Sequence, residues 1–109
     1  MRLQIIIGVA LVALAAAPAG AEDLAKGEKV YADHKCAMCH SIGEKGNKKG
    51  PLDGVGTKLS HDDIRAWMTD AKGMTAKTKS ARKPAMKSYE LAKEDLDALA
   101  DYMASLKKK

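Results

Sequence analysis

The sequence has few of the bulky side chains that usually fill a protein core. Its 109 residues contain no phenylalanine, one tryptophan and three tyrosines. Small domains bury a modest share of their unfolded surface, so they are marginally stable without disulfides, metals or cofactors. A bulky apolar prosthetic group would complete such a core. The composition therefore favours a domain that binds a cofactor.

The sequence also lacks alternating hydrophobic patterns, internal repeats and low-complexity linkers, so it predicts no strand and a single domain. Helical spacing predicts a first helix over residues 23–33. A second begins after Ser60, which forms an S-x-x-D capping box with Asp63, and ends near Gly73. The last helix carries Leu96, Leu99, Met103 and Leu106 on one face. Glycines and prolines predict loops over residues 43–56 and 74–90. The expected class is all-α with long loops.

The one long apolar run lies at the N-terminus. Met1 and Arg2 precede an uncharged segment over residues 3–17, and Ala19-Gly20-Ala21 follows as a small-x-small site. A membrane anchor needs roughly 20 apolar residues, whereas Pro18 and Gly20 end this run early. We therefore predict a cleaved signal peptide over residues 1–21, a folded domain over residues 22–109, and export to the periplasm.

Cysteine is scarce, and both cysteines lie in the stretch HKCAMCHS. A disulfide is the default in an exported protein, but a C-x-x-C disulfide is usually catalytic and set among βαβ elements, which the pattern does not predict. Zinc would lack a fourth ligand beside Cys36, Cys39 and His40. The third interpretation is C-x-x-C-H, the haem c attachment signature. Two thiols at this spacing can each add to one vinyl group of a porphyrin, with His40 beneath the iron.

With G-P-L at 50–52 and D-L-D-A-L-A-D-Y-M-A-S-L in the last helix, the chain resembles the small soluble class I c-type cytochromes. The resemblance covers essentially the whole predicted mature chain. It implies three to four helices and long loops around one covalent haem, with Gly27 and Tyr31 on the first helix crossing Tyr102 on the last. Tyr31 lies five residues before Cys36, one more than is usual in the family.

The ligand on the side of the haem opposite His40, the distal ligand, decides the type of site. If a side chain fills that position the protein is an electron carrier, and if it stays open the iron can bind other molecules. The predicted mature chain offers Met38, Met68, Met74, Met86 and Met103, besides His34 and His61. Met38 lies between the cysteines and cannot reach the opposite face, and Met68 and Met103 fit apolar helix faces. Met74 and Met86 remain, with a histidine or an open site as alternatives. The family places its ligand shortly before the last helix, near a proline, which favours Met86.

The resemblance implies two further haem contacts. Pro51 matches a proline whose carbonyl accepts a hydrogen bond from the axial histidine, which would fix the tautomer of His40. Trp67 would either donate its indole N–H to a haem propionate or pack against the ring. We treat both roles of Trp67 as open.

Negative charge is missing from residues 71–89, which contain six basic residues and no acidic one. Such a segment favours docking onto an acidic face of a redox protein. The location and the scarcity of aromatics argue against nucleic-acid binding. The resemblance implies a monomeric monohaem carrier of single electrons, without enzymatic activity or a small-molecule substrate. The alternatives are a haem enzyme or gas sensor with an open distal site, and a thiol–disulfide module without haem.

Overall fold

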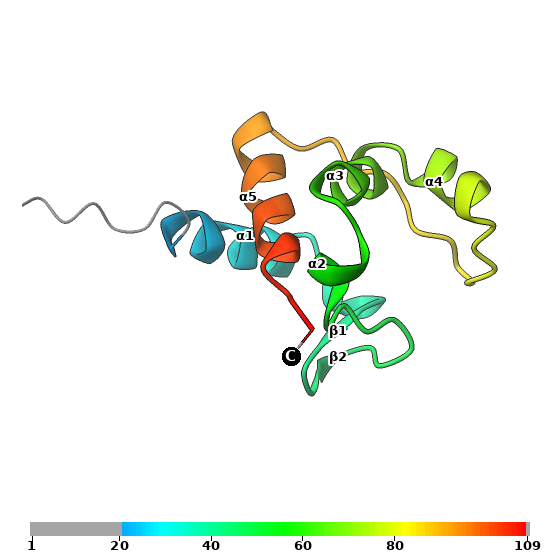
Figure 1. Ribbon diagram of the computed structural model, residues 1–109, viewed down its shortest axis with the longest axis horizontal. Coiled ribbons are helices and arrows are strands. Elements are labelled where there is room, and N and C mark those ends of the chain that lie inside the picture. The colour runs from blue at the N-terminus through cyan, green and yellow to red at the C-terminus, as the bar shows by residue number, and fades with distance from the viewer. Residues whose placement is uncertain (1–20, 109) are drawn as a thin grey trace, which may run out of the picture.

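The first and last helices of the described chain cross each other. The computed structural model describes residues 21–108, in which α1 spans Ala21–Asp33 and α5 spans Lys93–Ala104. They lie against one another in Figure 1. The helices approach closely because Gly27 has no side chain: a Cβ there would lie 2.2 Å from the carbonyl oxygen of Ala98. Next to it, the rings of Tyr31 and Tyr102 meet edge to face with centroids 6.2 Å apart. The crossing implied by the resemblance is therefore present.

The segment after α1 is more regular than the sequence predicts. A 3-10 turn, η1, spans Cys36–Met38, and two short strands follow, β1 at Ser41–Ile42 and β2 at Lys45–Gly46. The strands pair antiparallel, with Ser41 opposite Gly46. Gly43 begins the hairpin turn at a φ of +59°, which glycine adopts without strain. A single helical turn, α2, spans Val55–Lys58. The predicted loop over residues 43–56 thus contains the turn and second strand of a small hairpin and the start of α2.

The middle of the chain forms two helices where one was predicted. α3 spans His61–Thr69 and begins as expected, because the Ser60 hydroxyl accepts a hydrogen bond of 3.1 Å from the backbone N–H of Asp63. It ends before Gly73, and α4 follows at Ala71–Thr78. The Asp70 carboxylate starts α4 by accepting the N–H of Gly73 at 3.1 Å. The prediction of irregular structure is therefore wrong for residues 74–78, whereas residues 79–92 have no helix or strand.

The core forms where α1, α3 and α5 meet, and it contains aliphatic side chains and methionines in place of phenylalanine. Its buried members are Val30, Ile64, Met68, Leu99, Ala100 and Met103. Leu96 and Leu106, both predicted in the last helix, are partly buried at the border of this core, but α5 ends at Ala104 and Leu106 follows it. No helix among residues 21–108 combines the length and apolarity that a membrane span requires. Apart from Ala21, the predicted signal peptide lies outside the described residues.

Candidate functional site

A cavity of about 600 Å³ opens beside the core. Its lining residues come from the end of α1, the cysteine turn, α2, α3, α4, α5 and the extended chain that precedes α5. Leu52, Leu59, Ile64 and Leu99 give the interior an apolar character. The predicted site residues that line it are Cys36, Cys39, His40, Trp67 and Met86. The structure thus brings together in one cavity all of the predicted site residues except Pro51.

The cysteine turn is held in place by its own backbone. The N–H groups of Cys39 and His40 both donate to the carbonyl of Cys36, at 3.1 and 2.9 Å. Asn47 also stabilises the turn, because its side-chain amide donates a hydrogen bond of 3.1 Å to the Met38 carbonyl. The two cysteines form no disulfide with each other. Burial raises the pKa of the Cys36 thiol.

His40 has a defined tautomer because of its backbone partner. Its Nδ1 lies 3.0 Å from the carbonyl oxygen of Gly50. A carbonyl can only accept, so Nδ1 carries the hydrogen and Nε2 keeps a free lone pair. Burial lowers the pKa of His40; the hydrogen bond to Gly50 opposes this shift and the charge of Arg82 adds to it. The imidazole is therefore neutral at pH 7, the state in which a histidine binds a metal.

The carbonyl that holds His40 corrects the prediction for Pro51. Ser41 pairs with Pro51 in a parallel bridge, in which the Ser41 N–H donates to the Gly50 carbonyl at 3.1 Å. Successive carbonyls of an extended segment point to opposite sides. The Gly50 carbonyl therefore faces the histidine segment, while that of Pro51 points away. Pro51 is exposed and does not line the cavity.

The structure separates the candidate methionines. Met86 is half-buried and lines the cavity, whereas Met74 is 8 % exposed on α4 and does not reach the cavity lining. Met38 is 71 % exposed beside the cysteines. Met68 and Met103 line the cavity as well, but both belong to the buried core between α3 and α5, as the sequence predicted.

Aromatic side chains other than Trp67 also form part of the cavity wall. The Tyr31 hydroxyl donates to the His40 carbonyl at 3.5 Å, and burial raises its pKa to about 12. Tyr89 and His34 meet edge to face with ring centroids 5.6 Å apart. Both line the cavity. Nothing in the local sequence marks this pair, because 55 positions separate the two residues.

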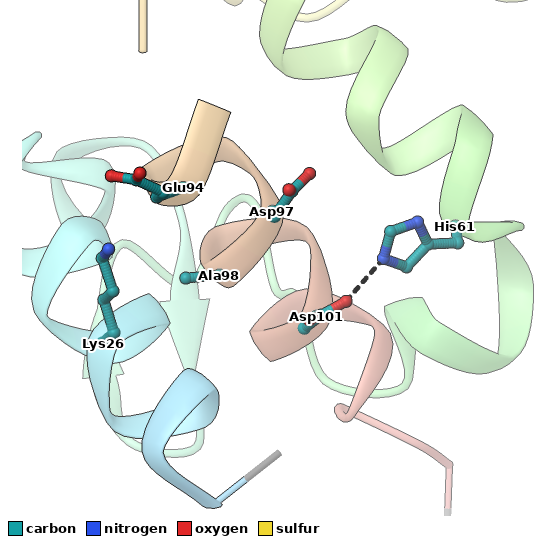
Figure 2. Close-up of a pocket in the computed structure, with 6 residues that line it drawn as sticks. All are labelled: Lys26, His61, Glu94, Asp97, Ala98 and Asp101. Atoms are coloured by element: carbon teal, nitrogen blue, oxygen red, sulfur yellow. Dashed lines mark hydrogen bonds and ion pairs between the residues drawn. The ribbon is translucent and has the colours of Figure 1, made fainter. Parts of the chain in front are cut away.

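A second depression of about 390 Å³ lies outside this cavity and shares no lining residue with it. Figure 2 shows Lys26 of α1 and His61 of α3 facing Glu94, Asp97 and Asp101 of α5. His61 Nε2 lies 2.7 Å from a carboxylate oxygen of Asp101. No group of three or more histidine, cysteine or acidic side chains among residues 21–108 is arranged to hold a metal ion. Within the depression, the contact between His61 and Asp101 joins α3 to α5.

Comparison with known proteins agrees with the geometry of the cavity. The family model described as "Cytochrome c" matches residues 24–107. Cytochrome c2 of Blastochloris viridis is 42 % identical over 50 residues, a match that covers 45 % of this chain and 38 % of that relative. No solved structure matches the chain significantly.

The cavity suits the cofactor of this family. Its volume of about 600 Å³ lies within the range of roughly 300–1,000 Å³ that is typical of small-molecule and cofactor sites. Proteins of the family bind haem c covalently through two cysteines, and Cys36 and Cys39 lie at the cavity wall beside a histidine with a free Nε2. From the matched residues and this site, we conclude that the chain belongs to the cytochrome c family.

Proposed function

We propose that the protein is a monohaem carrier of single electrons whose iron is bound by His40 and Met86. The observation that carries this proposal is the cavity: an imidazole and a thioether line one apolar space together with both cysteines. Histidine–methionine ligation fills both axial positions of a haem iron and raises its reduction potential. An iron closed on both sides suits electron transfer and leaves no open position for a substrate.

When bound, haem c supplies an iron that takes up and releases one electron. The chain's residues hold that centre in place. The hydrogen bond from His40 Nδ1 to the Gly50 carbonyl fixes the imidazole ring and strengthens Nε2 as a donor. Ile64 and Leu99 exclude water from the cavity. Trp67, half-buried on α3 and part of the cavity lining, would contact the haem either through its indole N–H or through the face of its ring.

The charge distribution supports a redox protein with an acidic docking face as the partner. Residues 71–89, the basic segment, include α4 and the chain that carries Met86. Five lysines of this segment are exposed: Lys72, Lys77, Lys79, Lys83 and Lys87. A surface of one sign raises the rate of encounter with an oppositely charged partner. We place the monomeric protein in the periplasm, on the strength of the signal-like sequence at residues 1–21.

Carbon monoxide binding to the reduced holoprotein tests this function. A thioether bound to iron must dissociate before carbon monoxide can enter, so binding to the wild type should be slow. Met86→Ala opens the position and should bind carbon monoxide rapidly, which provides the positive control. Rapid binding by the wild type would contradict the carrier proposal and favour a haem enzyme or a gas sensor.

A further inference from the structure

The Met86 segment, residues 81–87, is held to the rest of the protein at few points. The N–H of Ser80 donates to Thr75 at 3.1 Å just before it, and the N–H of Tyr89 donates to Met68 at 2.7 Å just after it. Among residues 21–108, a single hydrogen bond joins the Met86 segment itself to another part of the chain. Its donor is the guanidinium of Arg82, and its acceptor is the carbonyl of Cys39.

Several features of the structure accommodate this contact. Arg82 is half-buried and lines the cavity, unlike the exposed lysines of the basic segment. Gly50 leaves room for the guanidinium, since a Cβ on Gly50 would lie 1.8 Å from Arg82 Nη1. Gly50 also supplies the carbonyl that holds His40. The guanidinium therefore lies against both the cysteine turn and the acceptor of the axial imidazole.

We propose that Arg82 is a positioning residue that fastens the Met86 segment to the cysteine turn and so keeps the Met86 sulfur at the iron. The inference rests on the proposed ligation by Met86. Arg82 lies four positions before Met86, and Cys39 directly precedes His40. The hydrogen bond thus connects the chain that carries the distal ligand to the chain that carries the proximal one. A hydrogen bond from a charged donor is stronger than a neutral one, and the planar guanidinium fixes its direction.

Competition by imidazole for the ferric iron of the holoprotein measures how firmly Met86 is held. Each variant is titrated with imidazole, and displacement of Met86 is followed by loss of the near-infrared band of the iron–thioether bond. Arg82→Gln should bind imidazole about tenfold more tightly than the wild type, because it lacks the charged donor. Lys83→Gln is the matched control: it removes the same charge one residue away, where the side chain is exposed, and should leave the affinity unchanged. Arg82→Lys keeps the positive charge and an N–H donor but lacks the planar guanidinium. Its affinity for imidazole should lie between those of Arg82→Gln and the wild type.

The thermal midpoint of unfolding, measured on the same variants, separates positioning from general stability. Equal imidazole affinity in Arg82→Gln and the wild type would overturn the inference, even if the midpoint fell. An equal increase in imidazole affinity in Arg82→Gln and Lys83→Gln would also overturn the inference, because the loss of a positive charge alone would then explain the effect. If the wild type lacks the iron–thioether band, the proposed ligation fails and this inference fails with it. If the band is present and Arg82→Gln has no effect, only the inference fails.

Discussion

Three glycines allow close approaches between segments that are distant in the sequence. Gly27 lets α1 cross α5, and Gly56 of α2 lies where a Cβ would come within 2.1 Å of the Ala104 carbonyl oxygen. Gly50 lies between the Cys39 carbonyl and the Arg82 guanidinium. In each case the neighbour of the missing side chain includes backbone, which cannot move aside as a flexible side chain can.

Gly27→Ala should destabilise the protein by about 1–3 kcal/mol, because the new methyl group must separate α1 from α5. The free energy of unfolding in denaturant measures the effect on the holoprotein. Ala32→Ser, at an exposed position of the same helix, is the control and should change the stability little. A stability of Gly27→Ala equal to that of the wild type would show that the helices do not meet at this glycine.

Single residues also show how far the sequence predicts the site. Cys36, Cys39 and His40 are predictable because their chemistry depends on spacing within one turn. The acceptor of the His40 hydrogen bond could not be predicted in this way. The β-bridge between Ser41 and Pro51 turns the Gly50 carbonyl, and not that of Pro51, toward His40. Arg82 was likewise counted as surface charge, because no local pattern distinguishes it from the neighbouring lysines.

Between helices, a carboxylate links α3 to α5. Asp97 of α5 accepts from Arg65 of α3 and, at 2.8 Å, from Lys93 of its own helix. Hydrogen bonds from Lys93 and Arg65 lower the pKa of Asp97 from 3.8 to about 2. The carboxylate therefore remains ionised in the folded protein at a pH where it would be protonated in the unfolded chain.

This shift predicts a difference in acid stability between the wild type and Asp97→Asn. The stabilisation from the ionised carboxylate is fully present above pH 3.8 and is lost as the pH falls toward about 2. Unfolding free energies measured across this range should thus fall more steeply in the wild type than in Asp97→Asn. Asp33→Asn, at an exposed position of α1, is the control. Parallel pH curves for the wild type and Asp97→Asn would contradict the predicted role.

The helices differ in how well the sequence predicts them. α5 was expected because apolar residues recur at helical spacing and acids occupy its first turn, although the predicted stripe ran on to Leu106, beyond the end of the helix at Ala104. α4 was missed because its eight residues include a glycine and two threonines and show no apolar stripe. Its formation depends on the Asp70 cap and on burial of Ala71 and Met74, which are known only once the chain has folded.

At the scale of the whole molecule, the basic segment and the acidic side chains of α5 line different hollows of the surface. The exposed lysines of the basic segment flank the cavity, in whose lining Thr75, Thr78 and Lys87 of that segment take part. Acidic side chains of α5 line the separate depression in Figure 2. A negatively charged redox partner should therefore approach from the side of the basic segment.

Oxidation of the reduced holoprotein by hexacyanoferrate(III), an anionic probe, tests this asymmetry. The rate should fall as salt is added, because the Debye length shrinks to about 10 Å at 0.1 M ionic strength. Replacing Lys72 and Lys77 together by glutamine should lower the rate at low salt and weaken its dependence on salt. Lys29→Gln removes a charge from the exposed surface of α1 and should have a smaller effect. Equal effects of these changes would argue against a localised docking surface.

The most direct test of the account is the near-infrared absorption of the ferric protein, in which a weak band reports an iron–thioether bond. Wild type and Met74→Ala should both show the band, because Met74 is buried on α4 outside the cavity lining. Met86→Ala should lose it while keeping the covalent haem. A band that survives in Met86→Ala, or that disappears in Met74→Ala alone, would contradict the assignment of Met86 as the distal ligand.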